Sequence, residues 1–302
     1  MKLVILSRRA SLYSTRRLTQ AARKRGHTVR VMNPLDFTMV LSTRNPELYY
    51  KGRKMDSVDA VIPRIGSSIT FYGLAVVRQF EMIGTYCVNE SNAIARSRDK
   101  LRALQLLSRA DEIGVPATAI ARRPDHARRM LAHVGGAPAI VKLIQGTQGA
   151  GVVIVDSKQS FDSVIDAFHA IGQNILIQSF VKEAKGTDIR ALVVGRRVVA
   201  AMTRRAVEGE FRSNVHLGGS ATRANLPPEY RKAAVAAAQR MGLGVAGVDM
   251  LASDEGPMIM EVNSSPGLEG IERSSGVDVA DAIIAHIERN ARPGRTRDKV
   301  GK

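Results

Sequence analysis

Two different patterns of apolar and polar positions divide the chain near residue 92. In the first, short apolar or β-branched runs alternate with amphipathic stretches of helical period. The expected strands are 2–7, 28–32, 59–65 and 86–89, and the expected helices are 12–25 and 71–83. Because strands separated by helices tend to pair in parallel, residues 1–91 predict a parallel sheet with helices on its faces. Residues 39–56 show no clear period, so we expect a long loop there.

The second pattern consists of short β-rich runs with fewer helices between them, after a helical connector expected at 92–111. The expected strands are 115–121, 139–144, 152–156, 175–181, 189–194, 198–204, 245–251 and 258–263, and the expected helices are 124–134, 158–170, 227–241 and 277–289. Residues 207–221 follow no pattern, and a loop of that length inside a compact domain is usually functional. The chain as a whole therefore predicts an α/β (α+β) fold that begins with a parallel-sheet domain.

The composition is that of an ordinary globular protein. Of 302 residues, 44% are hydrophobic and 24% are charged, which excludes an intrinsically disordered chain. Apolar runs such as 152–155 are too short to cross a bilayer, and Arg8 and Arg9 interrupt the apolar run near the N-terminus. The single cysteine, Cys87, excludes an internal disulfide framework. We therefore expect a protein of the cytoplasm with no membrane partner.

The net charge of +17 is unusual for a chain of this size. Residues 289–302 carry six basic residues and one acidic residue, and they predict a basic, disordered tail; the rest of the chain still carries +12. Such a field favours a polyanionic partner, namely a nucleotide, a nucleic acid or an acidic protein segment, although a surface adapted only for solubility explains the charge equally well. Aromatic residues make up only 4% of the chain, so stacking platforms for single-stranded nucleic acid are poorly supplied.

The runs 245–251 and 258–263 predict a β-hairpin that carries two carboxylates. If the turn is centred on Glu255, Asp249 faces Glu261 across the hairpin, with Cβ atoms roughly 5 Å apart. Strand alternation places Asn263 on the same face as Glu261. The opposite face then receives Met258, Met260 and Val262.

Two carboxylates so close together are costly unless a cation neutralises them. Asp249, Glu261 and the amide oxygen of Asn263 are the ligand types that Mg²⁺ or Mn²⁺ prefers, so we expect a metal site. The alternative is that the two acids pair with arginines on a solvated face. The apolar residues that flank Glu261 favour the metal, because an unpaired buried charge is expensive.

A lysine in an apolar strand is the second candidate for function. Lys142 lies in the middle of the run 140–144 and needs an anion as its partner. The glycine-rich segment 145–151 follows it and could offer backbone N–H groups to phosphate oxygens. It is no Walker A loop, and a strand follows it, which predicts a hairpin flap over phosphates. A simple glycine-rich hairpin turn explains the glycines equally well.

Further cations lie in and beside the patternless loop. Arg204, Arg205 and Arg212 could bind phosphate or carboxylate oxygens, as could Lys100 at the start of the connector. Each is also typical of a solvated surface charge. The six histidines show no close metal-ligand spacing, and no G-x-S-x-G elbow occurs, so hydrolase chemistry has little support.

Taken in order, these features resemble the ATP-grasp superfamily, and more closely the RimK family, whose members add glutamate to the C-terminus of ribosomal protein S-six. The resemblance runs from residue 1 to about 288. The stretches that carry it are YYKGRK (49–54), AVIPRIG (60–66), TFYG (70–73), RDKL (98–101), GTQG (146–149), GEFRSN (209–214) and EVNSSPGLEG (261–270). It implies an ATP-grasp fold with a pre-ATP-grasp domain at 1–95, an ATP-grasp domain at 96–288 and the basic tail at 289–302.

The resemblance also implies a role for each candidate residue, with ATP and two Mg²⁺ or Mn²⁺ ions as cofactors. Lys100 and Lys142 would contact the ATP phosphates, and Arg212 and Lys142 would be catalytic. The other implied nucleotide contacts are Gln178, Ser179 and Phe180 to adenine, Asp188 to ribose, and Arg212, Ser213 and Asn214 over the phosphates. Asp249, Glu261 and Asn263 would bind the metal ions. The family commonly has Glu where this chain has Ser179, which bears on nucleotide affinity only if that side chain contacts the base.

The implied reaction joins two substrates without an enzyme nucleophile. ATP phosphorylates a carboxylate, and the amine of free glutamate attacks the resulting acylphosphate. The implied acceptor is the tail of ribosomal protein S-six, reached near the ribosome through the basic surface, and the implied assembly is a homo-oligomer, a dimer or tetramer. One alternative is a ligase of the same superfamily that glutamylates a small-molecule coenzyme or a carrier-bound amino-acid intermediate. Another is a non-catalytic RNA- or ribosome-binding module, against which the set of Lys142, Asp249, Glu261 and Asn263 speaks.

Overall fold

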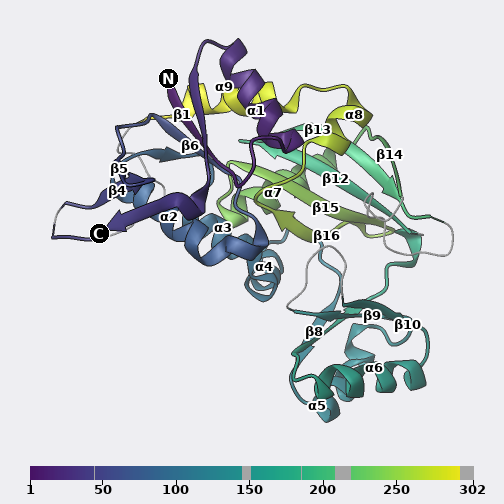
Figure 1. The fold of residues 1–302 in the computed structure, drawn as a ribbon. Coiled ribbons are helices and arrows are strands. Elements are labelled where there is room, and N and C mark those ends of the chain that lie inside the picture. The colour runs from purple at the N-terminus through teal and green to yellow at the C-terminus, as the bar shows by residue number, and fades with distance from the viewer. Residues whose placement is uncertain (44, 145–150, 185, 208–218, 293–302) are drawn as a thin grey trace.

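The computed structural model describes residues 1–43, 45–144, 151–184, 186–207 and 219–292. Their strands form four sheets, and helices cover the sheet faces (Figure 1). One sheet is parallel and belongs to the N-terminal part of the chain. The other three are antiparallel, so the expected mixed α/β architecture is confirmed.

The parallel sheet has the strand order β2-β1-β6-β7. Its strands are β1 (Lys2–Leu6), β2 (Thr28–Met32), β6 (Ala60–Pro63) and β7 (Tyr86–Cys87), and its helices are α1 (Tyr13–Lys24) and α2 (Thr70–Met82). β1 and β6 are central and almost wholly buried, which is why both are continuous apolar runs in the sequence. The predicted parallel sheet is confirmed.

The long loop expected at 39–56 is wrong, because a small antiparallel sheet occupies this region. Its strands are β3 (Phe37–Val40), β4 (Glu47–Tyr50) and β5 (Arg53–Lys54), and the 3-10 helix η1 (Pro34–Asp36) precedes them. Each strand has at most four residues, and β4 buries only Leu48. At most one buried position per strand gives no period to detect, so sequence alone could not separate these strands from a loop.

The expected connector is two helices, α3 (Ser91–Arg98) and α4 (Lys100–Leu107). Asp99 separates them, because its side chain accepts a hydrogen bond from the backbone N–H of Arg102 and caps α4. A four-stranded sheet of order β10-β9-β11-β8 follows and has a core of its own. Its elements are β8 (Thr118–Ala121), α5 (Pro124–Met130), η3 (Ala132–Val134), β9 (Ala139–Leu143), β10 (Val152–Val155), α6 (Lys158–Ala170) and β11 (Ile175–Ser179).

The largest sheet is antiparallel, with the order β14-β13-β12-β15-β16. Its elements are η4 (Lys182–Ala184), β12 (Thr187–Val194), β13 (Arg197–Arg205), β14 (Ser220–Arg223), α7 (Pro228–Met241), β15 (Val245–Ser253), β16 (Gly256–Asn263), α8 (Glu269–Ser275) and α9 (Val279–Asn290). The strand β14 and the helix α8 had no signal in the sequence pattern. Both are short, and β14 has no fully buried residue.

The five-stranded sheet buries both faces. Along β12, Leu192 and Val194 belong to one core cluster, whereas Ala191 and Val193 belong to another. The second cluster contains four buried alanines of α7, whose small side chains allow the helix to lie close to the sheet. Strand alternation therefore gives this sheet two independent cores.

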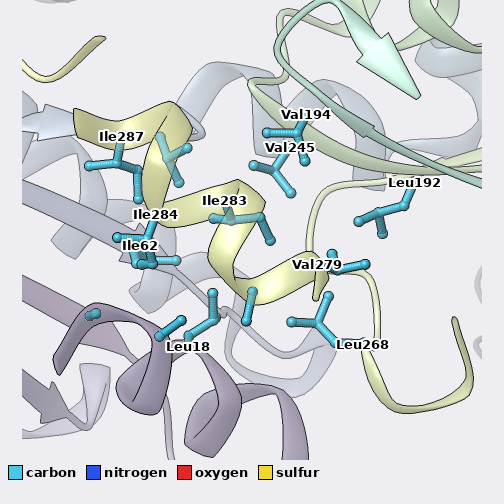
Figure 2. Packing of buried hydrophobic residues seen from close by; sticks show 14 of the residues in the cluster. Leu18, Ile62, Leu192, Val194, Val245, Leu268, Val279, Ile283, Ile284 and Ile287 are labelled. Atoms are coloured by element: carbon cyan, nitrogen blue, oxygen red, sulfur yellow. The ribbon is translucent and has the colours of Figure 1, made fainter. Parts of the chain in front are cut away.

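One core cluster joins the parallel sheet to the five-stranded sheet (Figure 2). Helix α9 lies between them and contributes Ile283, Ile284 and Ile287. Leu18 of α1 and Ile62 of β6 contact this cluster from the N-terminal side. Since burial of one such side chain stabilises by about 1.5–3 kcal/mol, the two sheets are held as one body.

The side chain of Asn89 adds four hydrogen bonds at the same junction. Its side-chain oxygen accepts hydrogen bonds from the backbone N–H groups of Gly244 and Val245, at 2.8 and 2.9 Å. Its amide nitrogen donates to the carbonyl oxygens of Val245 and Ser264, at 2.8 and 2.9 Å. Asn89 is buried, so all its hydrogen-bonding capacity serves to fix the end of β7 against β15.

Within the part of the chain that the structure describes, no helix combines the length and apolar character that a membrane span needs.

Candidate active site

The hairpin of β15 and β16 places Asp249 directly opposite Glu261, as predicted, but by a different route. Ser253 pairs with Gly256, so the turn is one residue shorter than a turn centred on Glu255. A β-bulge between Asp249 and Met250 then shifts the register by one residue and restores the facing carboxylates. The bulge is next to the carboxylate pair. Bulges beside active sites commonly change the direction of a side chain.

The bulge also changes which apolar residues of β16 are buried. Ile259 and Val262 both lie in the core, 0% and 1% exposed, although they are three residues apart. Met260 is only partly buried and belongs to no core cluster. The expectation that Met258 and Met260 share the face of Val262 is therefore wrong, because it assumed unbroken alternation.

Arginines from two neighbouring strands bind Asp249. Arg190 of β12, its cross-strand neighbour, donates to both carboxylate oxygens at 2.7 and 2.6 Å. Arg204 of β13 donates to Asp249 Oδ2 at 3.0 Å. Arg204 also holds Asp188, its own cross-strand neighbour, through two bonds of 2.6 Å. The four side chains form one network across three strands.

This network partly matches the alternative that the sequence left open, pairing with arginine, but its setting is different. Asp249 is 5% exposed and Arg204 is also 5% exposed, so this ion pair is not solvated. Burial raises the pKa of Asp249, but the charges of Arg190 and Arg204 outweigh burial and hold it at about 2. Asp249 is therefore a permanent anion in a buried site.

Glu261 has the opposite environment. Its side chain reaches water, yet protein atoms crowd it on most sides, and this burial raises its pKa; the negative charge of Asp249 raises it further. Among the described residues, its carboxylate makes no hydrogen bond or ion pair. Within the part of the chain that the structure describes, Oδ1 of Asp249 accepts one hydrogen bond. Asn263 lies two residues along β16 from Glu261 on the same face. These oxygens fit a hard divalent cation, which would neutralise the facing carboxylates.

Lys142 of β9 is held from the neighbouring strand. Its ammonium group donates to Gln178 Oε1 at 2.6 Å, and the amide nitrogen of Gln178 donates to Thr118 Oγ1 at 2.9 Å. Burial lowers the pKa of Lys142 to about 8, the nearby cation Lys100 lowers it too, and Glu261 opposes both. Gln178 therefore orients Lys142 with its side chain, a role that sequence reasoning did not foresee.

The predicted phosphate-binding and metal-binding residues come together between two sheets. Lys100, at the first position of α4, lies close enough to Glu261 for the two charges to shift each other's pKa, and Lys142 does the same. These three residues come from a helix, the four-stranded sheet and the five-stranded sheet. Ser179 and Phe180, at and just after the end of β11, are both partly buried. Arg212, Ser213, Asn214 and most of the glycine-rich segment lie outside the described residues.

Sequence reasoning described one arginine of the site incompletely and missed another. Arg204 is a buried strand residue that binds carboxylates, one of the two ligand types expected for it, so the alternative of a solvated surface charge is wrong. Arg190 was not singled out at all. The signal that could have found it is the alternation of Asp188 and Arg190 along β12, which puts both charges on one face beside Asp249.

The chain matches two family profiles in sequence order. The RimK pre-ATP-grasp domain matches residues 1–94, and the RimK-like ATP-grasp domain matches residues 97–287. Similar proteins from Thioalkalivibrio sulfidiphilus and Maridesulfovibrio salexigens, each named probable alpha-L-glutamate ligase, are 58% and 56% identical over 299 residues. Each alignment covers 99% of both chains.

Solved structures support the fold. The ATP-grasp ligase PsnB, in complex with a precursor variant, Mg and ADP, superposes with a TM-score of 0.75 at 22% identity, covering 96% of this chain and 98% of PsnB. The RimK domain protein ATP-grasp from Sphaerobacter thermophilus gives 0.68 at 22% identity, covering 95% and 100%. With the family profiles and the site described above, they lead to one conclusion: the chain belongs to the RimK family and is an ATP-dependent ligase with an ATP-grasp fold.

Proposed function

We propose that this protein uses ATP to add glutamate to the C-terminus of ribosomal protein S-six. The observation that carries the proposal is the meeting of Lys100 and Lys142 with the facing pair Asp249 and Glu261. Two cations suited to phosphate oxygens and two carboxylates suited to a cation are what phosphoryl transfer to a carboxylate requires. Glutamate as the added amino acid is supported by the names of the relatives that are 56–58% identical over the full length.

The reaction has two bond-forming steps. An oxygen of the acceptor carboxylate attacks the γ-phosphorus of ATP. The bond between this phosphorus and the oxygen that bridges it to the β-phosphate breaks, and ADP leaves. The amine nitrogen of glutamate then attacks the carbonyl carbon of the acylphosphate. The new C–N bond replaces the C–O bond to phosphate, and the amine loses a proton. Catalysis comes from positioning and from cations around the phosphoryl group, since no residue forms a covalent intermediate.

Each candidate residue has a role in binding the nucleotide or in transferring its phosphate. Lys100 and Lys142 bind phosphate oxygens, with Lys142 oriented by Gln178. Gln178, Ser179 and Phe180 lie along the adenine, largely through backbone groups. Three further residues outside the described part of the chain, Arg212, Ser213 and Asn214, close over the phosphates, with Arg212 catalytic.

Asp188 is assigned to the ribose hydroxyls. In this structure both of its carboxylate oxygens accept from Arg204, so the assignment requires that they also accept from the sugar. A carboxylate oxygen has two lone pairs, which makes this possible without breaking the ion pair.

Asp249, Glu261 and Asn263 hold two Mg²⁺ or Mn²⁺ ions in this proposal. When bound, the ions neutralise the phosphate oxygens and orient them for transfer. The carboxylate of Glu261, which has no hydrogen-bond or ion-pair partner among the residues that the structure describes, supports the assignment most directly. Arg190 is then a positioning residue, because its two bonds fix the orientation of Asp249.

The partner and location complete the proposal. An excess of 17 positive charges suits the acidic tail of a protein acceptor and proximity to the ribosome. We assign the protein to the cytoplasm, as a homo-oligomer of two or four chains, with domains at 1–95 and 96–288 and a basic tail at 289–302. Exposed charges are screened by salt, so activity should fall as ionic strength rises.

Intact-mass spectrometry of ribosomal protein S-six tests the proposal. The protein is incubated with Mg-ATP, glutamate and purified S-six, and the expected result is a ladder of glutamate-sized mass increments that is absent without ATP. ATP consumption with a small-molecule or carrier-bound acceptor, and no change in the mass of S-six, would support the ligase chemistry but contradict S-six as the acceptor. No ATP consumption with any acceptor would contradict the proposed activity.

A further inference from the structure

Arginines lie at the carboxyl edge of the parallel sheet, just after the ends of two of its strands. Arg8 follows β1 by two residues and Arg64 follows β6 directly. The backbone N–H of Arg64 donates to the carbonyl oxygen of Leu6 at 2.9 Å, which keeps the two strand ends side by side. The carboxyl edge of parallel strands is where open α/β sheets bind their ligands.

A third arginine connects this edge to the active site. Arg98, the last residue of α3, donates through one terminal nitrogen to Thr70 Oγ1 at 2.8 Å and through the other to the carbonyl oxygen of Ile65. It thereby fixes the segment that follows Arg64. Lys100 is two residues further on and already lies near Glu261. The arginine cluster and the proposed phosphate site are thus joined by two residues of chain.

In the described part of the chain, Arg8, Arg64 and Arg98 form no ion pair with an acid. Among the described residues, the side chain of Arg64 makes no hydrogen bond or ion pair, and burial alone lowers its pKa to about 10. Burial also lowers the pKa of Arg98, whose Nε is buried without a partner. By contrast, Arg190 and Arg204 have carboxylates at 2.6–3.0 Å. A partly buried guanidinium group without an anion is costly, so a bound anion would stabilise this edge.

We propose that Arg64, which precedes the segment fixed by Arg98, binds a carboxylate of the incoming glutamate. This inference rests on the proposed ligase function. Of the two substrates, the acceptor carboxylate must meet the γ-phosphate and is consumed. Incoming glutamate keeps both of its carboxylates as anions through the reaction and needs a cationic site apart from the phosphates. Arg64 offers a planar fork that matches a carboxylate.

Steady-state kinetics of an Arg64→Gln variant test the inference. Loss of a charge-assisted hydrogen bond should raise the KM for glutamate by about 10- to 100-fold, with the KM for ATP within twofold of wild type. Arg30→Gln is the matched control, because it removes an exposed arginine from β2 of the same sheet. The melting temperature of Arg64→Gln should be equal to or above that of wild type, since the variant removes an unpaired charge.

Substrate analogues identify which carboxylate is bound. If Arg64 holds the side-chain carboxylate, Arg64→Gln loses the wild-type preference for glutamate over glutamine. If it holds the α-carboxylate, the variant instead loses the preference for glutamate over glutamate α-amide. Either result supports the inference. Unchanged preferences, an unchanged KM for glutamate, or a rise confined to the KM of the acceptor would overturn it while the ligase function stands.

Failure of the underlying function has a different signature. Wild-type protein that consumes ATP without incorporating glutamate would contradict the proposed function and, with it, this assignment of Arg64.

Discussion

Substitution of Lys142 by methionine should stabilise the protein while it abolishes turnover. The pKa of Lys142 falls from 10.5 to about 8, mainly through burial. That difference corresponds to about 3 kcal/mol spent at neutral pH to keep the ammonium group charged in the folded protein. A methionine side chain of similar length avoids this cost and cannot bind phosphate.

The sign of the pH dependence follows from proton counting. Below pH 8 both folded and unfolded chains hold the proton, and the full cost is present. Between pH 8 and pH 10.5 the folded chain has lost the proton and the unfolded chain retains it, so wild-type stability rises with pH through this group. The advantage of Lys142→Met should therefore shrink by about 2 kcal/mol between pH 8 and pH 9.5.

Urea unfolding of wild type and variant at several pH values, followed by circular dichroism, measures this difference. The loss of the hydrogen bond to Gln178 is common to every pH and cancels from the slope. Lys158→Met, at the exposed start of α6, is the matched control and should give a pH-independent difference. A Lys142→Met advantage that does not change between pH 7 and pH 9.5 would refute the reasoning.

Three other predictions concern the nucleotide, the carboxylate network and the domain junction. The dissociation constant for ATP, measured by fluorescence titration, should rise up to about tenfold per pH unit above pH 8, because Lys142 loses its charge; a flat profile would argue against Lys142 as a phosphate ligand. Asp249→Asn should abolish ligase activity and cost about 3–5 kcal/mol in urea unfolding, because the partly buried Arg190 loses its carboxylate partner and the buried Arg204 keeps only Asp188. An active variant would refute the metal assignment. Gly244→Ala should lower the melting temperature, because the added Cβ would lie 2.4 Å from the carbonyl oxygen of Val88. The control Gly267→Ala should leave it unchanged, because its Cβ meets no atom within 4 Å. Equal melting temperatures for the two variants would contradict the prediction.

Sequence reasoning was strongest where one side chain or one long period carried the information. The helix at 158–170 matches α6 at both ends, because a capping serine, Ser157, and a strong apolar stripe define it. The parallel sheet was also predictable, since β1 and β6 are buried on both faces and read as unbroken apolar runs. Short strands with one buried residue, such as β4, left no such trace.

The facing pair of Asp249 and Glu261 shows how a prediction can be confirmed for an incomplete reason. Two apolar runs around a turn indicated the hairpin. The centre of the observed turn lies half a residue before Glu255, the centre that the sequence predicted. A β-bulge that no pattern announced compensated for this error. Bulges are set by local twist and by packing against neighbouring strands, so a two-residue period alone cannot place them.

The sequence by itself determined the fold class, the order of the two domains and the identity of the charged candidates, because these depend on local periodicity and on residues that stand out in apolar runs. Only the tertiary structure decided which charges meet. Arg190 and Arg204 bind Asp249, whereas Arg64 forms no ion pair with any acid in the described ranges, and all three are ordinary arginines in the sequence. The physical reason is that the stability of a buried charge depends on partners brought from distant strands, and that pairing exists only after the sheets have formed.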